Sequence, residues 1–153
     1  MGSKSIMAVI SLAAFAVILN PRVSVSAGET EIKKVKGREF KVEFHSRKEI
    51  SIGEETIIKV FIFPKKKWKI NLQYPSALRV VSADGFSVKR GILKRADAHR
   101  YDEKELRFEI QMMPRKEGNH RVHLTVDFAL CVGSRCILEK VEEEISFTLR
   151  RGE

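Results

Sequence analysis

The sequence predicts an all-β chain that folds as an antiparallel β-sandwich. Apolar residues recur at every second position through most of the chain, which is the side-chain period of a half-buried strand. Turn residues separate these segments, and no segment after the N-terminus has the period of a helix. Seven or eight short strands of this kind, joined by turns, are typical of a two-sheet sandwich.

Residues 1–27 have the order of a secretory signal peptide. Met1–Lys4 is positively charged, residues 6–19 are almost entirely apolar, and a short polar segment ends in small residues at Ala27. This order predicts export and cleavage near Ala27. An uncleaved membrane anchor is the alternative, but a bilayer span needs roughly 20 apolar residues, more than this run provides.

The chain after Ala27 holds 27 basic and 20 acidic residues, a net charge of about +7. Such a charge favours anionic partners in general, but the charges are interspersed, as in a well-solvated exported domain. The densest run, Lys65–Lys69, includes Trp68 and suggests at most a weak contact with an anionic surface. The alternative is a loop whose tryptophan packs under the edge of the sandwich. No pattern indicates a nucleic-acid partner.

The first part of the exported chain is predicted to be irregular and then strongly β. Residues 28–38 are polar and charged and are predicted to form a flexible leader. The domain, residues 39–150, opens with a half-buried strand whose apolar positions are Phe40, Val42 and Phe44. Gly53 marks a turn. Residues 57–63 are nearly all apolar, β-branched or aromatic, which predicts a central strand covered on both faces.

The remaining strands follow in order. Short strands are predicted within residues 68–72, 78–81 and 86–88, the last two separated by an Asp84-Gly85 turn. Residues 91–102 have no clean period. Alternation then resumes in three long segments, residues 106–112, 122–130 and 141–149. Met112 continues this alternation, so the Met112-Met113 pair predicts core packing rather than copper binding.

The only two cysteines, Cys131 and Cys136, are predicted to lie opposite each other on one β-hairpin. Apolar residues are even-numbered on the strand before Cys131 and odd-numbered on the strand after Cys136, so both sulfurs fall on the outer face. A four-residue loop, 132–135, contains a glycine for the turn. Directly paired residues have Cα atoms about 4.5 to 5.5 Å apart, which permits a disulfide.

Three interpretations of this pair stay open. A structural staple is the commonest role of two cysteines in an exported protein. However, closing a loop of about six residues stabilises by only about 2.2 kcal/mol, against about 4.7 kcal/mol for a 100-residue loop, so a redox role is favoured. A metal site is the third. His123 shares the face of Cys131 but lies eight residues away along the strand, too far for both to bind one ion.

The chain resembles the N-terminal domain of DsbD-type thiol–disulfide interchange proteins over residues 40–149. Three features carry the resemblance, in the same order along the chain: a glycine turn at Gly53 before the apolar strand, the segment Trp68-Lys69-Ile70-Asn71-Leu72-Gln73-Tyr74-Pro75, and the hairpin with Cys131 and Cys136. The resemblance implies an immunoglobulin-like sandwich, here of about seven to nine strands, located in the periplasm.

The resemblance also implies a function for the cysteine pair. In the family the pair accepts reducing equivalents from a thioredoxin-like domain or a multi-span membrane protein and passes them to periplasmic disulfide proteins. Only Cys131 and Cys136 transfer as site residues. This chain has Leu130 before the first cysteine and Ile137-Leu138 after the second, where the family often has a polar residue and a proline pair. By position, the family's aromatic cap loop falls within residues 91–102, which offer Ile92, Leu93 and Tyr101.

Two functions from different classes therefore follow from the sequence. The first is a thiol–disulfide relay module, an oxidoreductase of the protein-disulfide reductase type, with Cys131 and Cys136 as its catalytic residues. Which cysteine attacks stays open. The second is a non-catalytic binding or assembly module of the cell envelope, with a structural hairpin disulfide. No cofactor or metal ligand set is indicated, and hydrolase and nucleotide-binding motifs have no counterpart in the chain.

Overall fold

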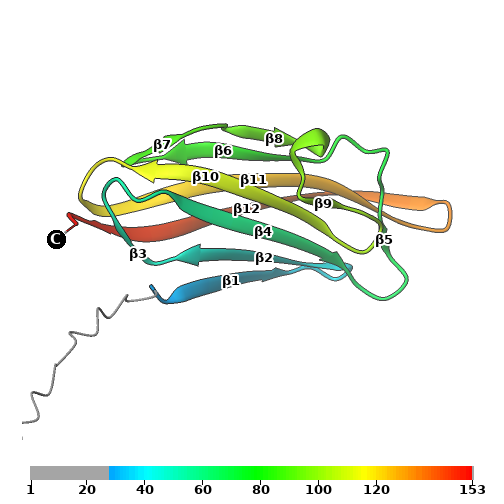
Figure 1. The fold of residues 1–153 in the computed structure, drawn as a ribbon. Helices are drawn as coiled ribbons and strands as arrows, with labels where there is room; N and C mark the ends of the chain where they lie inside the picture. The colour runs from blue at the N-terminus through cyan, green and yellow to red at the C-terminus, as the bar shows by residue number, and fades with distance from the viewer. Residues whose placement is uncertain (1–27, 153) are drawn as a thin grey trace, which may run out of the picture.

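The structure is a computed structural model that describes residues 28–152, so the predicted signal peptide lies outside the described residues. Two β-sheets pack face to face (Figure 1). Sheet A has the order β1 (Thr30–Lys36), β2 (Phe40–Arg47), β4 (Thr56–Pro64), β10 (Leu106–Pro114) and β7 (Phe86–Val88), with β9 (Arg100–Tyr101) also on β10. Sheet B has the order β3 (Glu49–Ser51), β12 (Arg135–Arg150), β11 (Gly118–Val132), β6 (Ala77–Ala83) and β8 (Ile92–Lys94), with β5 (Lys69–Ile70) also on β11.

The predicted all-β sandwich is confirmed, with more strands than expected. Residues 28–152 contain twelve strands, of which seven have seven or more residues and five have only two or three. Each short strand is a loop segment that pairs with a longer strand over two or three residues. So few residues show no alternation of apolar and polar side chains, so the sequence does not reveal these strands. One pairing, β12 with β3, is parallel; the others are antiparallel. The only helix in this range is a single 3-10 turn, η1 (Arg95–Asp97), and no helix there could span a membrane.

The predicted flexible leader at residues 28–38 is wrong. β1 occupies most of it and pairs with β2 from Thr30 opposite Arg47 to Lys36 opposite Lys41. The strand reads as polar because it forms the edge of sheet A, where even its apolar Ile32 is 46% exposed. An edge strand can be held by backbone hydrogen bonds without burying a regular apolar face, so its sequence lacks the alternation that marks a strand.

The core lies between the sheets and is built from the predicted alternating residues. Each of the long alternating segments buries its apolar row, and Met112 is 1% exposed, as predicted. The rings of Phe40 and Phe128 meet edge to face across the sandwich, with centroids 5.2 Å apart. Because these residues come from opposite sheets, this contact joins the two layers beneath the hairpin tip.

The prediction that residues 57–63 are covered on both faces is wrong. β4 is central in sheet A, but only one of its faces is buried in the core. On the other face Phe61 and Phe63 are half-buried under cationic side chains: the Lys41 ammonium lies 5.0 Å from the Phe63 ring and the Arg107 guanidinium 5.7 Å from the Phe61 ring. Long basic side chains cover apolar surface with their methylene groups, so this face tolerates aromatic residues without a second layer.

Candidate functional site

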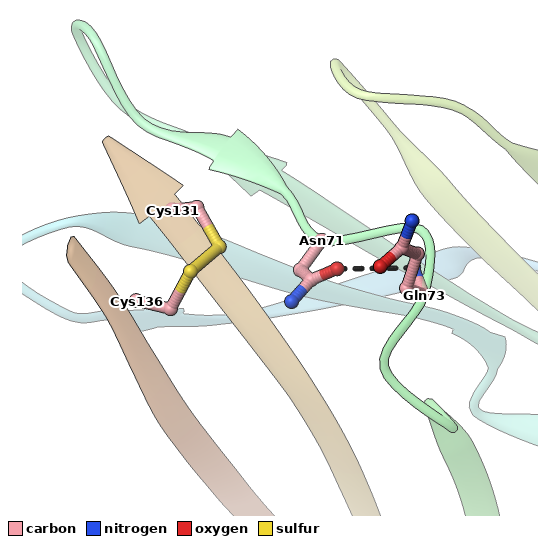
Figure 2. Close-up of a disulfide and its surroundings, with 4 residues drawn as sticks. All are labelled: Asn71, Gln73, Cys131 and Cys136. Carbon is pink, nitrogen blue, oxygen red and sulfur yellow. Dashed lines mark hydrogen bonds between the residues drawn. A yellow bond between two sulfur atoms is a disulfide. The ribbon is translucent and has the colours of Figure 1, made fainter. Parts of the chain in front are cut away.

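Cys131 and Cys136 form a disulfide at the tip of the β11–β12 hairpin. They are direct register partners with Cα atoms 4.1 Å apart. Figure 2 shows the bond crossing from one strand to the other. The predicted pairing on a single hairpin and the shared face are therefore confirmed. The neighbouring residues Leu130 and Ile137 belong to the opposite, core-facing rows of the same two strands.

The hairpin turn is tighter than predicted. Val132 and Arg135 still pair, so the four-residue loop becomes a two-residue turn at Gly133-Ser134. Gly133 has φ +57°, a left-handed conformation that glycine adopts at no steric cost. The pairing continues past the cysteines because a two-residue turn with positive φ matches the twist of antiparallel strands.

The two cysteines differ in their surroundings. Cys131 is half-buried and Cys136 is exposed. On the side of β11 away from β12, β5 pairs with the tip, and Lys69 lies directly opposite Cys131. On the side of β12 away from β11, no strand of residues 28–152 pairs with Cys136, since β3 reaches only Thr148–Arg150. One sulfur is thus flanked by a neighbouring strand and the other lies at a free edge.

A groove of about 550 Å³ runs beside Cys131. Its walls come from the Lys67–Gln73 segment, from Glu103 and from the hairpin turn. The Asn71 backbone N–H donates to the Ala129 carbonyl at 2.9 Å and fixes this segment against β11. The Asn71 side-chain oxygen accepts a hydrogen bond from the Gln73 backbone N–H at 3.0 Å, as Figure 2 shows.

The charges beside the disulfide are mostly positive. Lys67 and Lys69 line the groove, and the Lys69 ammonium pairs with the Glu103 carboxylate at 3.0 Å. The Arg135 guanidinium lies 5.9 Å from the ring of Trp68, which is half-buried against the core. Trp68 therefore packs at the edge of the sandwich, as the loop interpretation of Lys65–Lys69 expects. Lys67 and Lys69 from the same run line the groove beside the disulfide.

Residues 91–102 do not line the cysteine groove, contrary to the expected position of a cap loop. Leu93 is buried and Ile92 is half exposed on the strand β8. The Tyr101 hydroxyl donates to the carbonyls of Leu72 and Tyr74, at 3.1 and 3.0 Å. Tyr101 thereby supports the segment that forms the groove wall. Strand pairing through β5 decides which segment lies beside the sulfurs, and position along the chain does not reveal that pairing.

Lys69, Asn71 and Gln73 are residues near the disulfide that the sequence did not assign to the site. They lie in the segment Trp68–Pro75, and the family resemblance of this segment was the one feature of the sequence that could have pointed to them. Within residues 28–152 there is no group of three or more His, Cys, Asp or Glu side chains that could hold a metal ion.

Comparison with known proteins identifies no family. No protein-family model matches the chain, and no curated protein matches it. Among solved structures, the GAE domain of yeast GGA1 has 10% identity and a TM-score of 0.44, covering 76% of this chain and 99% of that one. The GAE domain of GGA2p from Saccharomyces cerevisiae has 19% identity and a TM-score of 0.43, covering 80% and 100%. AggA, the major subunit of aggregative adherence fimbriae type I from Escherichia coli, has 9% identity and a TM-score of 0.37, covering 80% and 97%. These scores carry no functional argument, and the sandwich assignment rests on the two sheets described above.

Proposed function

We propose that this protein is a thiol–disulfide exchange module that relays reducing equivalents through Cys131 and Cys136 in the periplasm. The observation that carries the proposal is an outer-face disulfide, exposed at Cys136, that joins directly paired residues of one hairpin. Such a bond closes a six-residue loop, stabilises the fold by only about 2.2 kcal/mol, and can be opened without disturbing the core. Exposed disulfides of this type are the ones suited to exchange.

In the proposed reaction the disulfide accepts two electrons from a donor dithiol. A donor thiolate attacks the Cys136 sulfur, a mixed disulfide forms, and Cys131 leaves as a thiolate. The donor's second thiolate then attacks the donor sulfur of that mixed disulfide and releases Cys136. The donor ends as a disulfide, and Cys131 and Cys136 end as thiols after taking up two protons. The reverse steps reduce a disulfide in the next protein.

Cys136 is assigned as the attacked sulfur because of the asymmetry of the hairpin tip. Attack on a disulfide sulfur proceeds in line with the bond that breaks, so it approaches Cys136 from the side away from Cys131. That side is the free edge of β12. The equivalent approach to Cys131 comes from the side occupied by β5 and Lys69. Lys69, the register partner of Cys131, brings a positive charge to the same groove, where it pairs with Glu103 and also favours the departing thiolate.

The partners implied are a thioredoxin-like domain or a multi-span membrane thiol-transfer protein as donor, and periplasmic disulfide proteins as acceptors. The test is the reduction potential of the pair together with exchange against a purified thioredoxin-like protein. We expect a potential above about −300 mV and rapid exchange. A potential below that value with no exchange contradicts the proposal, because it describes an inert structural bond.

Single-cysteine variants test the assigned roles. Cys131→Ser leaves the Cys136 thiol, which should attack a partner whose single cysteine carries thionitrobenzoate as a mixed disulfide, release thionitrobenzoate and form a stable mixed disulfide with the partner. Cys136→Ser leaves the half-buried Cys131 and is expected to form far less of that species. Ser134→Ala, in the same turn, is the matched control and should exchange like the unaltered protein. Equal trapping by the two cysteine variants contradicts the assignment of Cys136.

A second candidate function is a non-catalytic binding or assembly module of the envelope. Leu138, on the same face as the disulfide and 69% exposed, favours it, because an exposed large apolar side chain offers a contact surface. This candidate predicts that replacing both cysteines with serine leaves partner binding intact. The relay predicts that the same double variant loses all electron transfer.

A further inference from the structure

The outward edge of β12 next to the disulfide is unpaired. β12 is sixteen residues long, but only Thr148–Arg150 pair with β3, and β11 occupies the other side of the strand. Sheet edges with unpaired N–H and C=O groups accept an extended strand from another chain. The question is therefore which backbone groups of β12 point to this edge and what chemistry surrounds them.

Even-numbered residues of β12 direct their backbone groups to the free edge. Ala129, the register partner of Leu138, uses its carbonyl to accept from Asn71, so it points away from β12. In an antiparallel ladder such a residue and its partner are not hydrogen-bonded to each other, and the partner's groups also point outward. The Glu144 carbonyl confirms this parity farther along β12, because it accepts a hydrogen bond from Lys33 at 2.5 Å.

The edge beside the disulfide is therefore a row of free donors and acceptors. The N–H and C=O groups of Cys136, Leu138 and Lys140 face outward. No other strand of residues 28–152 pairs with them, and no other backbone group of this range bonds them. The Leu138 side chain stands on the same face as Cys136, two residues along the strand, and is 69% exposed. An added strand would place its own side chains against both.

The charge of this edge indicates what kind of segment would bind. Residues 136–146 contain four glutamates and one lysine, in a chain that is otherwise basic. Glu142, Glu143 and Glu144 have ion-pair partners. Glu139 and the nearby Glu39 have none within residues 28–152, and burial followed by the Glu39 charge raises the pKa of Glu139. A basic side chain placed opposite Glu139 would relieve this repulsion.

We propose that the edge from Cys136 to Lys140 binds an extended, basic segment of a partner polypeptide by strand addition. The apolar side chains of the segment contact Leu138 on the outer face, and its basic side chains face Glu39 and Glu139. Pairing with a second copy of this chain is disfavoured, because residues 136–146 of that copy would offer Glu39 and Glu139 a strand with four glutamates and only one lysine. The inference rests on the proposed function in one respect: the bound segment would lie beside the Cys136 sulfur, which the proposed exchange reaction attacks.

The test uses the isotope-labelled protein and an end-blocked nonapeptide in which valine and lysine alternate. At saturating peptide we expect exchange of the Leu138 and Lys140 amide protons to slow at least about tenfold, as amides that gain a backbone hydrogen bond do. The same peptide with N-methylated valines cannot complete the ladder and should give no protection. A peptide with glutamate in place of lysine should bind much more weakly.

Variants of the protein separate the backbone contact from the side chain. Leu138→Pro removes an N–H that points to the free edge, so it should abolish protection while the hairpin ladder stays intact. Leu138→Ala keeps that N–H and should retain protection with weaker binding. Lys140→Pro is a second edge variant, and the N-methylated peptide tests the same point without any substitution. Protection that persists in both proline variants, or that appears on another strand, overturns the proposal.

Docking and exchange can fail separately. The Cys131→Ser/Cys136→Ser variant should still protect the edge amides when peptide is added. If it does and the unaltered protein shows no exchange with any thioredoxin-like protein, docking stands and the relay fails. If Leu138→Pro exchanges with such a protein at the unaltered rate, the relay stands and docking fails. Protection that rises with protein concentration alone, together with a dimer in sedimentation, also overturns the proposal in favour of self-pairing.

Discussion

The two halves of the β11–β12 hairpin share one continuous ladder but differ in what surrounds them. In the body, residues 118–126 and 141–150, the hairpin is flanked by β6 and β3 and its core row packs against sheet A (Figure 1). In the tip, residues 128–140, only β5 adds a partner, and Cys136 and Leu138 face solvent. Both halves bury an inner row of side chains, including Phe128 and Leu130 in the tip, but only the tip also presents an accessible disulfide on its outer face.

The largest difference between the halves is expected from truncating one side chain in each. Phe147 is 2% exposed and meets the Phe86 ring edge to face at 5.1 Å. Phe147→Ala should lower the free energy of unfolding by about 3–5 kcal/mol, because it removes a core ring and leaves a cavity. Leu138→Ala in the tip should change it by less than about 0.5 kcal/mol. Urea denaturation checks both. Similar losses would show that the outer face of the tip, as well as its buried inner row, supports the fold.

Two glycines with positive φ give the next comparison. A Cβ added to Gly85, in the turn between β6 and β7, would lie 2.5 Å from the buried His120 ring, whereas one added to Gly133 would meet nothing within 4 Å. Gly133→Ala should cost about 1–2 kcal/mol from backbone strain alone. Gly85→Ala should cost a further 1–3 kcal/mol from overpacking. Thermal unfolding of the two variants gives the order, and an equal shift would contradict the predicted clash.

Removing the disulfide should have a moderate effect. The Cys131→Ser/Cys136→Ser variant is expected to lose about 2.2 kcal/mol or less, since the bond closes only a six-residue loop. Denaturant unfolding of this variant, and of the unaltered protein under reducing and oxidising conditions, gives the free energies of unfolding to compare. A much larger loss would mean that the tip is coupled to the body and that the bond is a structural staple.

The smallest effects should come from two carboxylates with opposite pKa shifts. Hydrogen bonds from Lys41 and then His45 lower the pKa of Glu43, on sheet A, so its ionised form stabilises the fold above the ordinary value of 4.5. That contribution is lost as pH falls through the lowered pKa. Burial raises the pKa of Glu139, in the tip, so its ionisation opposes folding at neutral pH.

Glu43→Gln should therefore lower stability at pH 7, and Glu139→Gln should raise it, each within about 0.5 kcal/mol because both groups are near the surface. In acid, the stability of each variant should approach that of the unaltered protein. For Glu139→Gln this happens as pH falls below the raised pKa towards 4.5, and for Glu43→Gln as pH falls below the lowered pKa. Urea titrations at pH 7 and pH 3 check the signs. Destabilisation by Glu139→Gln at pH 7 would contradict the repulsion between Glu39 and Glu139.

How much of this could be predicted depends on how each element is stabilised. Strands with one buried face, such as those with Phe44 or Leu124, were predictable because burial imposes a period of two on the residues. β1 was missed because an edge strand needs no such pattern. The prediction that both faces of β4 are buried was wrong. A run of apolar residues does not reveal that the side chains of Lys41 and Arg107, rather than a second layer, cover the outer face.

By itself, the sequence determined that the chain is a β-sandwich and that Cys131 and Cys136 share the outer face of one hairpin. Both follow from the alternation of apolar and polar residues along single strands, which depends only on residues close together in the sequence. Only the tertiary structure decided that β5 flanks Cys131, that the edge beside Cys136 is free, and that Tyr101 supports the groove. These features depend on which distant segments pair, and pairing is selected by the packing of the whole sandwich rather than by any residue pattern near the cysteines.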